Sequence, residues 1–334
     1  MELRLADHYD VLAIGNAIVD VIASHNDSFL EEQKIPKGSM RLISAEEAAR
    51  LYGQMGPGRE ISGGSAANTT AGIAALGGRA AFIGRVSDDQ LGRVFAHDIR
   101  AAGVDYRTAA ATSGPPTGQC LIIVSPDAQR TMNTFLGSCQ EVDEPDVDEA
   151  MVRAARVTYF EGYLWDPPAP IRAIRKAKGI ARAAGRKVAL TLSDVFCVEG
   201  HRADFLDMMQ AGLVDIVFAN ENEAKSLFQT DSIETAIEGL SAQVPLAIVT
   251  RSEKGAIVVN GRAREEVPVT PAARVLDTTG AGDLFAAGFL SGYTQERSLR
   301  DCAIMGTIAA AEVIEHFGAR PEADLKARVK AILG

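Results

Sequence analysis

Residues 277–283, with the sequence DTTGAGD, are the part of the chain best suited to chemistry on an anion. Gly280 and Gly282 have no Cβ atom, so a ligand can approach the backbone closely there. The amides of Gly280, Ala281 and Gly282 would point out of the N-terminus of the apolar helix that begins at Asp283, where the helix dipole favours an anion. Asp283 would repel a phosphate unless it had a task, and taking a proton from an attacking hydroxyl is such a task. An Asp-capped turn would explain any one of these residues, but it does not require both glycines.

Further polar residues follow two other predicted elements. Asn16 and Asp20 come after the apolar run at 11–15, which is typical of a buried parallel strand. Open α/β sheets bind their ligands at the carboxyl ends of such strands. Gly63-Gly64 leads into an Ala-rich helix, in which Asn68 is a poor choice unless its amide binds something.

The elements that must position these residues alternate between short apolar strands and helices. Strands are predicted at 11–15, 80–84, 157–161, 188–192, 214–219 and 246–250, and helices at 65–76, 90–102, 170–184, 203–211, 283–293 and 298–316. This alternation predicts an α/β fold with a mainly parallel sheet covered by helices on both faces. A hairpin predicted at 117–124 and 130–135 interrupts the rhythm, and with strands near 17–24 and 39–43 it predicts a small extra sheet.

Composition excludes several classes of protein. The chain has 334 residues, of which 47% are hydrophobic, with a net charge of −10 and a mean hydropathy of +0.03. The negative charge argues against nucleic acid or an anionic membrane as a partner. No apolar run approaches the ~18 residues that span a bilayer, and residues 1–10 are charged and lack the apolar region of a signal peptide. The four cysteines and five histidines show no metal-binding spacing, so reduced thiols and a cytoplasmic location are expected.

Three common motifs are absent from the sequence. There is no GxxxxGK[ST] phosphate-binding loop, no GxGxxG at the first βα turn, and no GxSxG. The sequence therefore argues against a P-loop enzyme, a dinucleotide-binding domain and an esterase-like hydrolase.

The DTTGAGD string closely resembles the second signature of the ribokinase-like (PfkB) family of carbohydrate and nucleoside kinases, and the stretch at 82–92 resembles its first signature region. The resemblance runs from Gly15 to Pro321. It implies one kinase domain over residues 1–334, built as a three-layer α/β/α sandwich with a mainly parallel central sheet. A small β-sheet lid, formed by segments near 17–45 and 115–137, is implied over the acceptor site. The implied reaction is phosphoryl transfer from ATP to a hydroxyl, with Asp283 as general base and the amides of Gly280, Ala281 and Gly282 as anion hole.

The resemblance also implies where ATP and its ions bind. Asn220 and Glu223 match an Asn-x-x-Glu motif that acts on Mg²⁺ and phosphate mainly through water. Thr250 and Gly255 match the turn on the nucleotide side, together with Gly280 and Gly282, although Ser252 stands where the family often has glycine. Asp277 and Thr279 match positions beside which many relatives bind K⁺. The alternative for Asp277 is that it only caps its own turn.

Within the family, several stretches look most like adenosine kinases: GNAIVD at 15–20, TLSDVF at 191–196 and FANENEA at 218–224. This resemblance implies phosphorylation of the 5′-hydroxyl of a nucleoside, adenosine to AMP. The residues implied to hold the ribose are Asn16, Asp20, Gly63, Gly64 and Asn68, and those implied to line an apolar slot for the purine are Met132, Leu136, Leu164 and Phe196.

Two other functions remain as alternatives. A sugar kinase of the same family would act on a ketose, ribose or a sugar acid. A non-catalytic nucleotide or nucleoside sensor would not need Asp283, so the intact DTTGAGD string argues against it. The sequence leaves open whether the protein is a monomer or a homodimer.

Overall fold

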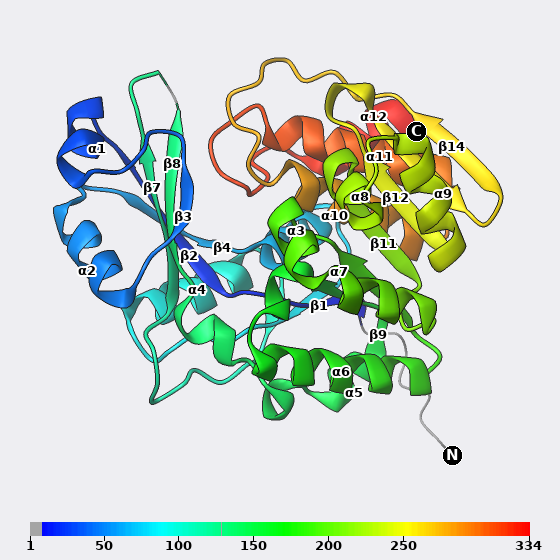
Figure 1. Cartoon of the computed structure of the whole chain (residues 1–334), viewed down its shortest axis with the longest axis horizontal. Helices are drawn as coiled ribbons and strands as arrows, with labels where there is room; N and C mark the ends of the chain where they lie inside the picture. Colours follow the sequence, from blue (N-terminus) through cyan, green and yellow to red (C-terminus); the bar gives the residue numbers. More distant parts are fainter. Residues whose placement is uncertain (1–8, 128) are drawn as a thin grey trace.

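The larger of two β-sheets organises the protein, of which a computed structural model describes residues 9–127 and 129–334 (Figure 1). Among these described residues it has nine strands, in the order β14-β13-β12-β11-β10-β9-β1-β5-β6. Their bounds are β1 Tyr9–Ile14, β5 Ala80–Ile83, β6 Asp105–Tyr106, β9 Ala155–Glu161, β10 Lys187–Thr191, β11 Ile216–Asn220, β12 Leu246–Thr250, β13 Ala256–Asn260 and β14 Ala263–Val267. In this sheet β12, β11, β10, β9, β1, β5 and β6 are parallel, and β13 and β14 add an antiparallel edge beside β12. The mainly parallel sheet predicted from the sequence is confirmed.

Helices cover both faces of this sheet. Along β1, Val11 and Ala13 belong to one buried cluster, whereas Leu12 and Ile14 belong to another, because successive strand residues point to opposite faces. The first cluster includes α3 (Ser65–Ala75), α4 (Gln90–Ala101), α10 (Ala281–Thr294), α11 (Leu299–Val313) and α12 (Leu325–Leu333). The second includes α5 (Glu149–Ala154), α6 (Pro168–Ala183), α7 (Val195–Gln210), α8 (Glu221–Phe228) and α9 (Ile233–Gln243). The predicted three-layer α/β/α arrangement is therefore confirmed.

A second, smaller sheet stands at the left of the main body in Figure 1. Its strands follow the order β3 (Met40–Leu42), β8 (Arg130–Phe135), β7 (Gly118–Val124), β2 (Ile18–Ser24) and β4 (Arg59–Gly63). Helices α1 (Asp27–Gln33) and α2 (Ala45–Gln54) contribute Leu30 and Leu51 to the cluster that includes Val21 and Leu121. The predicted small sheet is confirmed, with β4 as a strand that the sequence had not indicated.

The other face of the small sheet carries residues that matter below. Ile18 and Cys120 lie in a separate small apolar cluster, against which Met132 and Leu136 pack. The register pairs Asp20 with Cys120, Ile122 with Met132, and Val124 with Arg130. Because side chains alternate along a strand, Asp20, Met132 and Arg130 share this face.

Some elements differ from the prediction. Helix α7 begins at Val195, where the sequence predicted 203, because Asp194 caps it and a kink at His201 joins two helical pieces. The hairpin of β13 and β14 was not predicted. Short 3₁₀ turns, η1 (Gly137–Glu141), η2 (Glu144–Asp146), η3 (Gly162–Trp165) and η4 (Ser252–Lys254), complete the order of elements.

The structure bears on one of two sequence predictions, the absence of a membrane-spanning segment, and not on the other, the absence of a signal peptide. Within the described ranges, no helix is long and apolar enough to cross a bilayer. The prediction that the N-terminus has no signal-peptide region falls mostly on residues 1–8, which lie outside the described residues.

Candidate active site

The carboxyl ends of the parallel strands bring three predicted site residues, and Glu161 with them, to one edge of the large sheet. Asn16 follows β1, Glu161 ends β9, Asn220 ends β11 and Thr250 ends β12. Asn220 and Thr250 are direct neighbours in the register of β11 and β12. The site therefore lies where open α/β sheets place their ligands.

Glu161 joins the elements at this edge. Its Oε1 accepts hydrogen bonds from the backbone N of Asn16 at 2.9 Å and from Asn16 Nδ2 at 2.7 Å, and its Oε2 accepts one from the backbone N of Ala66 at 2.8 Å. Burial is the main cause that raises the pKa of Glu161 to about 7. Asn16 was predicted to bind substrate. In this structure it is 4% exposed and donates to Glu161, so it helps to fix the position of Glu161.

The glycine pair leading into α3 has a structural reason at both positions. Gly64 has φ +98°, and a Cβ atom there would lie 2.1 Å from the carbonyl oxygen of Asn16. A Cβ atom at Gly63 would lie 2.6 Å from the carboxyl group of Asp20. Gly64 therefore allows the start of α3 to approach the connection between β1 and β2, and Gly63 leaves room for Asp20.

Asp20 presents a carboxylate on the face of the small sheet described above. Its oxygens accept no hydrogen bond from any described residue. Burial raises the pKa of Asp20 to about 6; Arg130 and Arg320 oppose the rise, and the negative charges of Asp283 and Asp277 add to it. Asp283 acts on the charge of Asp20, and both carboxylates act on the Arg320 guanidinium, so the two carboxylates lie in the same electrostatic neighbourhood.

Asp283 is held in position by two side chains of α3. Its Oδ1 accepts a hydrogen bond from Ser65 Oγ at 2.6 Å, and its Oδ2 accepts one from Asn68 Nδ2 at 2.9 Å. Burial raises the pKa of Asp283, whereas the bonds from Ser65 and Asn68 lower it. Asn68 was predicted to bind ribose; here its amide nitrogen binds Asp283, and its Oδ1 is buried without a partner among the described residues.

The turn before α10 presents the amides that the sequence indicated. Gly280 has φ +79°, and a Cβ atom there would lie 2.6 Å from Ala319 Cβ, so the backbone requires glycine. Gly282 has open space where its Cβ would be. The N–H of Ala281 donates to the carbonyl of Thr278 at 3.2 Å, so the amides of Gly280 and Gly282 are the ones left for an anion.

Arg130 of β8 occupies the neighbourhood of the predicted K⁺ residues. Its Nη1 lies 2.5 Å from Asp277 Oδ2 and 2.9 Å from Thr279 Oγ1. The side chains of Arg130 and Asp277 are only 8% and 4% exposed. Arg130 Nε and Nη2 are buried with no partner in the described part of the chain.

Two of the residues predicted to bind the nucleotide and its Mg²⁺, Asn220 and Glu223, bind each other. Asn220 Oδ1 accepts from the backbone N of Glu223 at 2.9 Å, and the Glu223 carboxylate accepts from Asn220 N at 2.9 Å and from Asn220 Nδ2 at 2.5 Å. Burial is the main cause that raises the pKa of Glu223 to about 7. Thr250 ends the adjacent strand, and Gly255 has φ +83° with no room for a Cβ beside the carbonyl of Val267.

The four residues predicted for a purine slot are not brought together. Met132 and Leu136 pack on the same cluster of the small sheet. Leu164 is 1% exposed inside the second core cluster, beneath the large sheet's other face. Phe196 is 76% exposed at the start of α7.

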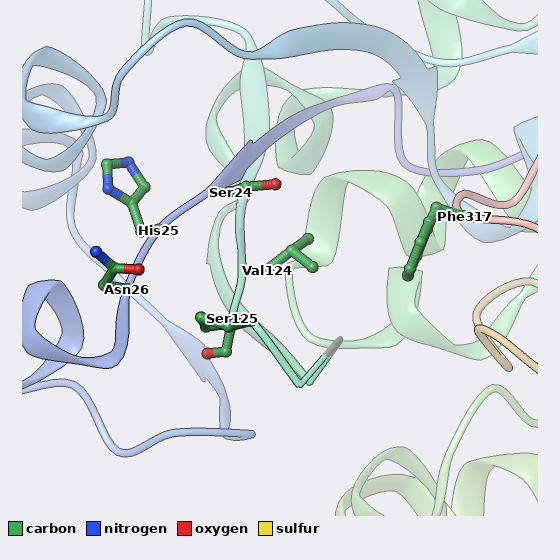
Figure 2. Close-up of a pocket in the computed structure, with 7 residues that line it drawn as sticks. Ser24, His25, Asn26, Val124, Ser125 and Phe317 are labelled. Atoms are coloured by element: carbon green, nitrogen blue, oxygen red, sulfur yellow. The ribbon is translucent and has the colours of Figure 1, made fainter.

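A pocket of about 480 Å³ opens at the edge of the small sheet (Figure 2). Ser24 ends β2 and is followed by His25 and Asn26, Val124 ends β7 and is followed by Ser125, and Phe317 faces them across the gap. None of the predicted site residues lines this pocket. It borders the site through Gly318, whose N–H donates to Asp277 Oδ2 at 3.0 Å.

Sequence reasoning missed four residues of this site: Ser65, Arg130, Glu161 and Arg320. Glu161 gave a usable signal, because a carboxylate ending an apolar strand is the pattern that indicated Asp20. Arg320 donates to the carbonyls of Ser62 and Ala67, and nothing in its local sequence announces these partners.

On this α/β fold, a buried carboxylate beside an open, amide-lined turn suits the transfer of a phosphoryl group to a hydroxyl group. Residues 39–325 match the model of the pfkB family of carbohydrate kinases, and the chain belongs to this family.

The proteins to which this chain is similar include nucleoside and sugar kinases. Adenosine kinase 2 of Arabidopsis thaliana is 27% identical, over 94% of this chain and 96% of its own length. The solved adenosine kinase from Sinorhizobium meliloti is 53% identical, with a TM-score of 0.90 over 97% of this chain and 99% of that chain. A probable sugar kinase from Rhizobium etli CFN 42 is 52% identical, with a TM-score of 0.91 over 97% of this chain and 98% of that chain. The substrate is thus a small-molecule nucleoside or sugar.

Proposed function

We propose that this kinase transfers the γ-phosphoryl group of ATP to the 5′-hydroxyl of adenosine, producing AMP and ADP. The observation that carries the proposal is the pairing of two carboxylates with different surroundings. Asp283 is fixed by Ser65 and Asn68 beside the amide-lined turn, whereas Asp20 has no hydrogen-bond partner among the described residues and faces the same site. One carboxylate suits proton removal, and the other suits binding of hydroxyl groups.

The proposed step balances as follows. The 5′-hydroxyl gives its proton to Asp283 while its oxygen forms a bond to the γ-phosphorus. The bond from that phosphorus to the β,γ-bridging oxygen breaks, and ADP leaves. The amides of Gly280 and Gly282 stabilise negative charge on the moving group, because amides already aimed at it need no reorganisation.

Recognition of the acceptor is proposed to use the small sheet. Asp20 accepts hydrogen bonds from two ribose hydroxyls, and Met132 on the same face offers apolar surface to the base. The small sheet then acts as a lid of a single kinase domain, which excludes water so that ATP is not hydrolysed. The ion pair of Arg130 with Asp277 supports this role, because it ties the sheet to the turn before α10.

Family membership implies ATP and, with it, Mg²⁺. The described residues hold no group of three or more His, Cys, Asp or Glu placed to bind a metal. Glu223 is 4% exposed and turned toward Asn220, so it does not fit as a direct ligand in this conformation. We therefore assign Mg²⁺ to ATP phosphates and water, with Asn220 and Glu223 acting at most through water. A role in purine salvage in the cytoplasm belongs to the same proposal.

A sugar kinase is the second candidate function. The 52% identical structure named a probable sugar kinase favours it, as does the separation of Leu164 and Phe196 from Met132 and Leu136. Sugars offer hydroxyls and need no large apolar slot.

A panel of acceptors tests the two candidates. ADP formation would be measured with adenosine, other nucleosides, ribose, ketoses and sugar acids, each at several concentrations. The proposal expects the highest kcat/KM with adenosine and AMP as product. A sugar with a higher kcat/KM than every nucleoside would refute it in favour of the second candidate.

A further inference from the structure

We propose that Arg130 supplies, from the small sheet, the positive charge that the family resemblance assigned to K⁺ at Asp277 and Thr279, so that turnover does not depend on a monovalent cation. This inference rests on the phosphotransferase activity and not on the choice of adenosine as acceptor. Arg130 is thereby a positioning residue: it acts on the turn through Asp277 and Thr279.

The first support is the position of the guanidinium. Arg130 Nη1 lies 2.5 Å from Asp277 Oδ2 and 2.9 Å from Thr279 Oγ1, which are the side chains of both residues predicted to bind K⁺. The pair is buried, with exposures of 8% and 4%. One cationic group thus contacts both predicted ligands.

The second support is that the Asp277 carboxylate is already satisfied. Its Oδ2 also accepts from the N–H of Gly318 at 3.0 Å, and its Oδ1 accepts from the N–H of Thr279 at 3.0 Å. Both oxygens therefore face N–H donors. Potassium requires a shell of oxygen atoms, and here nitrogen donors take the place of that shell around the carboxylate.

The third support is electrostatic. A guanidinium stays charged at any physiological pH, and in a buried site its charge is weakly screened. A K⁺ ion entering beside it would be repelled by a like charge. The arrangement accommodates one cation near Asp277, and the chain itself provides it.

The consequence for the turn follows from connectivity. Asp277 binds the amides of Thr279 and Gly318 and so fixes the segment from which Gly280 and Gly282 present their amides. Arg130 neutralises this buried carboxylate from β8 of the small sheet. The Arg130 guanidinium reaches Asp277 only when the small sheet is closed over the site. Neutralisation of Asp277 and closure of the site therefore occur together.

The test compares turnover in K⁺ and in tetramethylammonium at equal ionic strength, for the wild type, Arg130→Ala and Arg130→Lys. Arg41→Ala is the matched control, because Arg41 lies in the same sheet and pairs with Glu47 and Asn133, away from the turn. For the wild type and for Arg41→Ala, we expect the kcat in K⁺ and the kcat in tetramethylammonium to differ by less than about twofold. Arg130→Ala should lose about 10²-fold in kcat in tetramethylammonium. Added K⁺ or guanidinium ion should restore part of that loss. Arg130→Lys should retain more turnover than Arg130→Ala. In Arg130→Ala the KM for the acceptor should change less than kcat.

Two results would overturn the inference. Wild-type turnover that rises several-fold with K⁺ would show that a separate cation is needed. A loss of turnover in Arg130→Ala that neither K⁺ nor guanidinium restores would instead indicate one of two other roles. Arg130 would either donate hydrogen bonds to the phosphate or only hold the small sheet against the turn.

A measurement without substrates separates this inference from the proposed function. Thermal unfolding of the wild type should give the same Tm in both salts, whereas K⁺ should raise the Tm of Arg130→Ala because a bound ion stabilises the folded state. Titration with Tl⁺, followed by its nuclear magnetic resonance, should show binding to Arg130→Ala only. Saturable Tl⁺ binding to the wild type at this turn would contradict the inference, whichever acceptor the enzyme uses.

Discussion

Asp283→Asn is the substitution that tests the proposed chemistry most directly. The two side chains have the same shape, and the structure indicates that Asn can keep a hydrogen bond to each of the two side chains that hold Asp283. Its oxygen can accept from Asn68 Nδ2, as Asp283 Oδ2 does at 2.9 Å. Its amide nitrogen can then donate to Ser65 Oγ, which donates to Asp283 at 2.6 Å and, as a hydroxyl, is also an acceptor. We therefore expect a folded protein that binds its ligands.

The expected loss of turnover follows from what an amide cannot do. Asn cannot take a proton from the attacking hydroxyl, and general-base catalysis contributes about 10²- to 10⁴-fold. At 1.36 kcal/mol for each factor of ten, this corresponds to about 3–5 kcal/mol of transition-state stabilisation. Burial raises the pKa of the wild-type Asp283, and since only the carboxylate form is a base, wild-type kcat should fall as the pH falls through that raised pKa.

The assay needs three readouts on the same preparations. Steady-state ADP formation gives kcat, calorimetric titration gives the affinity for adenosine, and thermal unfolding gives Tm. Ser65→Ala serves as control, because it removes one bond to the base and keeps the base, so its loss of kcat should be much smaller. If Asp283→Asn kept kcat within tenfold of the wild type, with unchanged Tm and affinity, Asp283 would not be the base.

Three further predictions concern Asp20 and the glycine turn. Asp20→Ala should raise the KM for adenosine about 10- to 100-fold, from the loss of hydrogen bonds to a charged group, and should leave the KM for ATP unchanged; equal effects on both constants would exclude a ribose role. Because the pKa of Asp20 is raised to about 6 and the protonated form accepts poorly, the wild-type KM for adenosine should rise below about pH 6, and a flat profile in Asp20→Ala is the check. Gly282→Ala should keep or raise the Tm, since the added Cβ has open space, but it should lower kcat because the methyl group crowds the phosphate. Gly280→Ala should lower the free energy of unfolding by about 1–2 kcal/mol, because φ is +79° there. Denaturant titration with parallel kinetics measures both glycine variants, and similar Tm values for the two would contradict the assignment.

Much of the fold was predictable because its signals are local. The strand at 246–250 and the strand at 130–135 were predicted with the bounds that the structure shows, since each is a short β-prone run between turn residues. The hairpin of β13 and β14 escaped prediction for the opposite reason. Along β14 four of the five residues are exposed and the sequence is AREEV, so no apolar alternation marks it.

The site was predictable in its residue types more than in its partners. The sequence indicated that Asn68 must bind something, but its partner Asp283 lies 215 residues away, and only the packing of α3 on α10 brings them together. Arg130 was predicted only as the first residue of a strand. Its partner Asp277 lies 147 residues further on, and no local pattern encodes such a pair.

The long sequence separations within the site determine when it can exist. Glu161 links Asn16 and Ala66 across 145 and 95 residues, and Asp283 meets Ser65 only after 218 residues more of chain. Contacts this distant in sequence form late, because the loops that they close cost entropy before any contact is gained. On the ribosome, strands β1, β5 and β9 and helix α3 are therefore made long before α10 emerges. A nascent chain that already holds a nearly complete sheet still lacks Asp283, the proposed general base, so we expect activity only in the last steps of synthesis and assembly.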